Sequence, residues 1–142
     1  LKGKIMKTSA RNELTGKITN IITGSVMSEV KITVSPEVTV SATVTKEGLA
    51  SLGVNLNDEV TAIIKASSII ITKDAVKTTA RNVLKGKVVE VIKGAINSEV
   101  KLSLGTAIIS AIVTNDAIED LSIKVSEDAY AIIKASSVIL IA

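Results

Sequence analysis

The sequence lacks cysteine, histidine, phenylalanine and tryptophan, and Tyr130 is its single aromatic residue. Without cysteine, the chain has no disulfide and no thiolate metal site. Without histidine as well, we do not expect a site for a transition-metal cation. With one aromatic residue, the chain also lacks the stacking surfaces that single-stranded nucleic acids require.

An excess of one charge is also missing. Lysine and arginine number 17 and aspartate and glutamate 14, so the net charge is +3. This weak excess favours small anions and is not typical of a nucleic-acid binder. We find no signal peptide and no apolar run long enough to span a bilayer, and we therefore expect a cytoplasmic protein.

The sequence is instead rich in isoleucine, valine, leucine and alanine, and apolar residues make up 46% of it. Branched aliphatic side chains favour strands. Each half of the chain repeats the other: KTSARN at 7–12 returns as KTTARN at 77–82, and AIIKASS at 62–68 returns at 131–137. The sequence therefore predicts two copies of one domain, at residues 6–73 and 74–142.

Within the first copy, apolar runs and period-two alternation predict five strands, at residues 17–22, 29–34, 38–44, 60–65 and 69–72. Thr45 is expected to cap a short helix that ends at Gly53, and Thr114 opens its counterpart. The predicted fold is all-β: two tandem OB-like five-stranded barrels, each with one short helix.

The last strand of each copy is apolar on both faces and is expected to close its own copy. Apolar residues on both faces require cover on both faces, which predicts an oligomer. The repeated glycines Gly16, Gly24, Gly86 and Gly94 are expected to serve turn geometry.

Several motifs recur in the same order in both copies: Ser9-Ala10-Arg11-Asn12, the stretch from Gly24 to Glu29, Val44-Thr45, and Lys65-Ala66-Ser67. This arrangement resembles the molbindins, built from the Mop or TOBE domain, in their two-domain form. The resemblance implies a homotrimer of two-domain chains that stores molybdate or tungstate in the cytoplasm. The same domain pair also serves as the sensing part of molybdate-responsive regulators and transporters, and that role stays open.

Molybdate is a tetrahedral dianion without a proton at neutral pH, so its site must present hydrogen-bond donors rather than carboxylates. Each copy offers hydroxyls, a lysine, an arginine and a main-chain amide. The resemblance implies that these groups are the principal oxyanion ligands: Ser9, Arg11, Thr45, Lys65, Ala66 and Ser67, and Thr79, Arg81, Thr114, Lys134, Ala135 and Ser136.

The resemblance also implies a second oxyanion site, formed by Gly94, Ala95, Ile96, Asn97 and Ser98. In the first copy, Met27 replaces Asn97 and removes a side-chain donor, so this second site is expected in one copy only.

Each candidate ligand also has an ordinary structural interpretation. The arginines could pair with carboxylates, the threonines could act only as helix caps, and the lysines could lie at strand edges. Nucleic-acid binding by an OB-like barrel is a weaker alternative. We expect no enzyme activity, because the sequence has no nucleophile elbow, phosphate-binding glycine loop or paired acid and base. No organic cofactor and no membrane partner are expected.

Overall fold

The structure is a computed structural model that describes residues 9–10 and 12–142. The chain forms two compact units, and each unit combines segments of both sequence repeats. The first unit contains the described residues up to Ile64 together with the C-terminal segment from Ala135 to Ala142. The second unit runs from Lys65 to Lys134.

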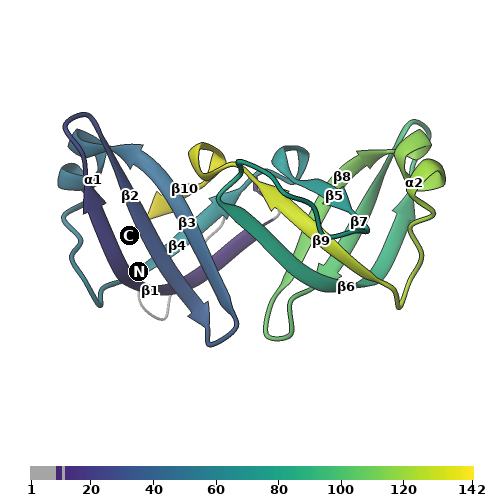
Figure 1. The fold of residues 1–142 in the computed structure, drawn as a ribbon, viewed down its shortest axis with the longest axis horizontal. Coiled ribbons are helices and arrows are strands. Elements are labelled where there is room, and N and C mark those ends of the chain that lie inside the picture. Colours follow the sequence, from purple (N-terminus) through teal and green to yellow (C-terminus); the bar gives the residue numbers. More distant parts are fainter. Residues whose placement is uncertain (1–8, 11) are drawn as a thin grey trace. The chain divides into compact units, whose positions relative to one another are not determined.

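The first unit is a five-stranded antiparallel sheet with one short helix (Figure 1). Its strand order is β10-β4-β1-β2-β3. Its elements are β1 (Asn12–Thr23), β2 (Met27–Ser35), β3 (Val38–Thr45), α1 (Lys46–Leu52), β4 (Glu59–Ile64), the 3₁₀ turn η2 (Ala135–Ser137) and β10 (Ile139–Ile141).

The second unit repeats this plan, with the strand order β5-β9-β6-β7-β8. Its elements are the 3₁₀ turn η1 (Ala66–Ser68), β5 (Ile70–Thr72), β6 (Asn82–Lys93), β7 (Asn97–Ser103), β8 (Ile108–Thr114), α2 (Asn115–Leu121) and β9 (Asp128–Ile133). The prediction of five strands and one short helix per unit is confirmed.

The short last strand of each unit comes from the other sequence repeat. β5 pairs with β9, where Ile71 lies opposite Ala131, and β10 pairs with β4, where Leu140 lies opposite Ala62. The expectation that residues 69–72 close their own copy is therefore wrong. The chain instead runs from an extended Lys65 through the 3₁₀ turn η1 into β5, which pairs with β9.

The long first strand of each unit is shared between two neighbours. Residues 12–17 of β1 pair with β4 and residues 17–23 pair with β2, with a bulge between Ile18 and Asn20. A bulge bends a strand and increases its twist, which lets β1 pair with β4 along its first part and with β2 along its second part.

Gly16 and Gly86 lie inside β1 and β6, so the expectation that they serve turns is wrong. A Cβ atom on Gly16 would come within 2.4 Å of the Thr33 carbonyl oxygen, and one on Gly86 within 2.5 Å of the Ser103 oxygen. Glycine is required there by close backbone approach. Gly24 does lie in a hairpin, where its N–H donates to the Met27 oxygen at 2.8 Å.

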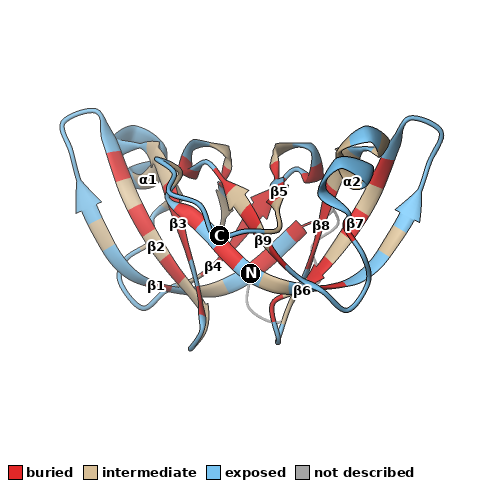
Figure 2. Cartoon of the chain, turned by 45° about the vertical axis from the view of Figure 1, so that its right-hand side comes forward, coloured by how far each residue is buried: buried red, intermediate tan, exposed pale blue. Residues whose placement is uncertain are grey.

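The core of each unit consists of aliphatic side chains. Figure 2 shows buried positions recurring along β2 and β7, where they alternate with half-buried ones. Leu14, Ile18 and Ile32 are almost fully buried in the first unit, as Val88 and Leu102 are in the second. Burial of this branched aliphatic surface drives the folding of both units.

Both helices have the caps that the sequence predicts. The Thr45 hydroxyl accepts from the Gly48 N–H at 2.9 Å, and the Thr114 hydroxyl accepts from the Ala117 N–H at 3.1 Å. Gly53 ends α1 in the left-handed conformation, whereas Ser122 takes that role in α2. In the described part of the chain, no helix is long and apolar enough to cross a membrane.

Candidate anion-binding site

In the first unit, the capping threonine of one repeat lies beside the C-terminal segment of the other. β3 ends at Thr45 and packs against η2, which contains Ala135 and Ser136. A pocket of about 300 Å³ opens here, lined by Thr45, Gly48 and the stretch from Val138 to Leu140. Ala135 is buried and Ser136 is exposed. The exchange of the last strands is therefore what brings Thr45 and η2 together.

The second unit has the same arrangement with the repeats interchanged. β8 ends at Thr114 and packs against η1, which contains Ala66 and Ser67. Ala66 is buried, while Lys65 and Ser67 are exposed. The candidate ligands of the first repeat at 65–67 thus accompany Thr114 rather than Thr45.

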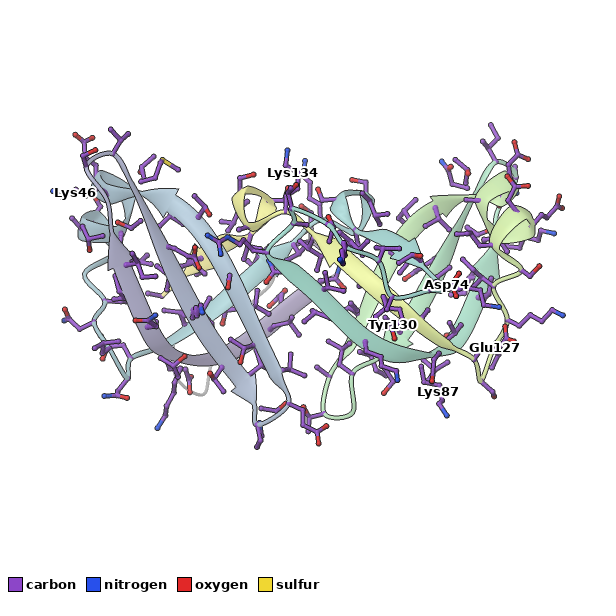
Figure 3. All side chains as sticks on the ribbon, in the orientation of Figure 1. Lys46, Asp74, Lys87, Glu127, Tyr130 and Lys134 are labelled. Carbon is purple, nitrogen blue, oxygen red and sulfur yellow. The ribbon has the colours of Figure 1, made fainter. Side chains whose placement is uncertain are left out.

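Two cationic candidates lie together at one end of the second sheet. Asn82 of β6 lies opposite Ile133 of β9, and its side-chain amide donates to the Ile133 carbonyl at 3.3 Å. Arg81 precedes this pair and Lys134 follows it, so both exposed side chains lie at the same end of the β6–β9 ladder. Figure 3 shows Lys134 at the end of β9. Thr79 is exposed just before Arg81.

The equivalent end of the first sheet repeats the backbone arrangement. The Asn12 side chain donates to the Ile64 carbonyl at 3.2 Å, and Ser9 is exposed just before it. Arg11 lies outside the described residues. Neither asparagine was singled out from the sequence, although both belong to the repeated Ser/Thr-Ala-Arg-Asn motif. Their structural role is to fix the strand ends that carry the candidate ligands.

The two capping threonines keep a proton available for an anion. A hydroxyl has one proton and two lone pairs, and capping uses a lone pair, so Thr45 and Thr114 can cap a helix and still donate to an anion. Lys65, Arg81 and Lys134 add positive charge. Among the described residues, no group of three histidine, cysteine, aspartate or glutamate side chains could hold a metal cation.

The second predicted site lies at the β6–β7 hairpin. Gly94, Ala95, Ile96 and Asn97 are exposed, whereas Ser98 is 2% exposed. The Ser98 hydroxyl donates to the Asn115 side-chain oxygen, and the Asn115 amide donates to the Gly94 carbonyl at 3.0 Å. Asn115 therefore fixes the hairpin to the start of α2. The sequence pattern gave no sign of this role, because Lys46 occupies the equivalent position in the first repeat.

A protein-family model and a solved structure both match nearly the whole chain. The TOBE domain family matches residues 8–71 and 78–140. The solved structure of ModG, a cytoplasmic molybdate-binding protein with molybdate bound, is 38% identical with a TM-score of 0.91. The match covers 95% of this chain and 98% of that one. This similarity confirms the tandem OB-like fold.

Sequence relatives extend the comparison. Molybdenum transport protein ModE of Azotobacter vinelandii is 38% identical over 95% of this chain and 51% of its own length. Molybdenum-pterin-binding protein MopB of Rhodobacter capsulatus is 30% identical over 99% of this chain and 53% of its own. The chain thus spans about half the length of these curated relatives. A probable molybdenum-pterin-binding protein of Haemophilus influenzae is 43% identical over 45% of this chain and 94% of its own length.

Proposed function

Since the chain belongs to the TOBE-domain family and has the tandem two-domain form of the molbindins, we propose that it binds molybdate. The same chemistry extends to tungstate, and storage of the oxyanion in the cytoplasm is the role that fits best. The observation that carries the proposal is the likeness of nearly the whole chain to a molybdate-binding protein solved with its ligand.

The residues proposed as ligands suit a proton-free dianion. Hydroxyls, ammonium and guanidinium groups and main-chain amides donate hydrogen bonds, and bonds from charged donors are the stronger ones. In the second unit the proposed ligands are Lys65, Ala66, Ser67, Thr79, Arg81, Thr114 and Lys134. In the first unit they are Ser9, Arg11, Thr45, Ala135 and Ser136. Gly94, Ala95, Ile96, Asn97 and Ser98 form the proposed second site.

We further propose that the chain assembles as a homotrimer. Ile70 on β5 is 61% exposed and Ile139 on β10 is 58% exposed, which supports apolar contacts with further copies. A trimer in light scattering is the expected result, and a stable monomer would contradict it. The proposal includes no catalytic step and no nucleic-acid, membrane or organic cofactor partner.

A second candidate role follows from the length of the relatives. Because this chain matches about half of the molybdenum transport protein ModE, the same domain pair could be the ligand-sensing part of a longer protein. Both roles require the same anion sites, so the binding experiment below serves both.

The direct test is equilibrium dialysis against molybdate, tungstate and sulfate at micromolar free ligand. Lys65→Ala and Lys134→Ala each remove a charged donor, worth about 1.5–3 kcal/mol, so affinity should fall by roughly 10- to 150-fold. Lys124→Ala, at an exposed lysine outside the proposed sites, is the matched control and should bind normally. Absence of molybdate uptake by the unaltered protein would refute the proposal.

A further inference from the structure

One residue holds the hairpin of the proposed second oxyanion site to the start of α2. The Asn115 side-chain nitrogen donates to the Gly94 carbonyl oxygen at 3.0 Å, and the Asn115 side-chain oxygen accepts from the Ser98 hydroxyl. The Asn115 main-chain N–H also donates to the Ile96 oxygen at 2.9 Å. Asn115 therefore fixes the hairpin at three of its residues.

The bond to Gly94 determines where the next main-chain donor points. The Gly94 carbonyl and the Ala95 N–H belong to one planar trans peptide, in which these two groups point in opposite directions. Because the carbonyl is directed at Asn115, the Ala95 N–H is directed away from it, and Ala95 is exposed. The same bond occupies a carbonyl oxygen whose partial negative charge would repel a dianion.

The bond from Ser98 indicates that its hydroxyl supports the site rather than contacts the ligand. Ser98 is 2% exposed, and its hydroxyl has a single proton, which it donates to Asn115. That bond also keeps the Asn115 side-chain amide in the orientation in which its nitrogen faces Gly94. Ser98 therefore acts on the hairpin through Asn115.

The first unit lacks this arrangement. Lys46 occupies the position of Asn115, and its main-chain N–H keeps the equivalent bond, to the Val26 oxygen at 2.8 Å. A lysine ammonium has donors and no acceptor, so Lys46 cannot accept from Ser28, the counterpart of Ser98. Among the described residues, the Ser28 hydroxyl has no hydrogen-bond partner. The first hairpin thus lacks the acceptor that links Ser98 to α2 in the second unit.

We propose that Asn115 is a positioning residue for oxyanion binding at residues 94–98. It presets the hairpin so that the Ala95 N–H faces the ligand, and it does not contact the ligand itself. A preset hairpin binds more tightly because it loses less conformational freedom on binding. The inference rests on the proposed second site, and it adds Lys46 to Met27 as a reason why that site belongs to one unit only.

The test gives the second unit the residue of the first. Amide chemical shifts of the ¹⁵N-labelled full chain are followed during titration with sodium molybdate. Ala95 and Ile96 report on the second site, and Ala66 and Ala135 report on the principal sites. Asn115→Lys removes two side-chain hydrogen bonds and should weaken binding at the hairpin by roughly 5- to 150-fold, with the principal sites unchanged.

This substitution separates positioning from charge. A lysine that acted by charge alone would attract the dianion and strengthen binding, so the two explanations predict opposite signs. The first unit shows that the fold accepts lysine at this position. Asp116→Asn is the matched control, because it also raises the net charge by one unit but leaves the hydrogen bonds of Asn115 in place. It should bind molybdate at least as tightly as the unaltered protein.

Three further variants test the link to Ser98: Ser98→Ala, Asn115→Ala and the two combined. Because Ser98 acts through Asn115, the combined variant should bind no more weakly at the hairpin than Asn115→Ala does. Fully additive losses would make Ser98 a direct ligand and would overturn the inference.

The positioning role is also overturned if Asn115→Lys binds at the hairpin as tightly as the unaltered protein, or more tightly. Either result leaves the proposed function intact. If Ala95 and Ile96 of the unaltered protein do not respond while Ala66 and Ala135 do, the second site is refuted and this inference with it, but the principal sites stand.

Discussion

Ile71 provides a test of the strand exchange, because it belongs to the first repeat but is buried in the second unit. It lies on β5 opposite Ala131 of β9 and is 5% exposed. Ile71→Ala removes three carbons, worth about 2.4 kcal/mol at ~0.8 kcal/mol for each buried methylene. The cavity left behind adds to this cost, so we expect the second unit to lose about 2–5 kcal/mol of stability.

Native-state hydrogen exchange measures this loss amide by amide. Since every 1.4 kcal/mol is a tenfold change, amides of β6 and β9 should exchange roughly 30- to 4,000-fold faster in the variant. Amides of β1 and β4 should change less. Ile70→Ala is the matched control, because Ile70 is adjacent and 61% exposed, and its effect should stay within about 0.5 kcal/mol.

The reciprocal variant is Val138→Ala. Val138 belongs to the second repeat, is 2% exposed and is part of the first unit, so its truncation should expose β1 and β4 to exchange. The reasoning would be refuted if Ile71→Ala released the amides of β1 and β4 while β6 and β9 kept their protection. That result would mean that each last strand closes its own repeat.

Three more predictions concern stability. Gly16→Ala should lower the free energy of unfolding by about 1–3 kcal/mol or more, because its Cβ atom would lie 2.4 Å from the Thr33 oxygen; an unchanged urea midpoint would contradict this. Thr45→Ala and Thr114→Ala should each lower the free energy of unfolding, measured by thermal unfolding, by about 0.5–2 kcal/mol, because the helix cap is lost. Serine at either position keeps a capping hydroxyl and should retain most of this stability. The hydrogen bond from Lys73 at 2.8 Å, aided by the charges of Lys73 and Lys124, holds the pKa of Glu127 below its ordinary value of 4.5. The stabilisation from the Lys73–Glu127 ion pair is therefore complete above pH 4.5 and is lost as the pH falls through the lowered pKa of Glu127. Glu127→Gln should remove this acid-side dependence from a stability–pH curve.

Much of each unit could be predicted because the residue patterns that indicate its strands and helix are local in the sequence. Alternating residues in 38–44 identify β3, and a hydroxyl at Thr45 with a glycine at Gly53 delimits α1. β1 was predicted too short, as residues 17–22 rather than Asn12–Thr23. Its first part holds one large aliphatic residue, Leu14, and a glycine required by close packing, so the apolar pattern there is weak.

The exchange of last strands could not be predicted because the competing pairings are chemically almost the same. The segment 62–68 is identical to 131–137, so β4 and β9 offer nearly the same edge to either apolar strand. The choice between them depends on the backbone path at 65–68, where Lys65 is extended and a 3₁₀ turn follows. Such a path is decided by packing rather than by residue pattern.

The same limit applies to the candidate site. Sequence identifies donor residues by type, but only the fold places Thr45 beside η2 and Thr114 beside η1. The role of Asn115 becomes visible only once Ser98 is seen to be buried and bonded to it.

The proposed function is tested most directly by a crystal structure of the protein grown with molybdate, in which anomalous scattering locates the metal. The account predicts molybdenum next to the amide of Ala66 in the second unit and the amide of Ala135 in the first, in each case within reach of the capping threonine hydroxyl of the same unit. Molybdenum absent from both positions, or held only among exposed carboxylates, would contradict it.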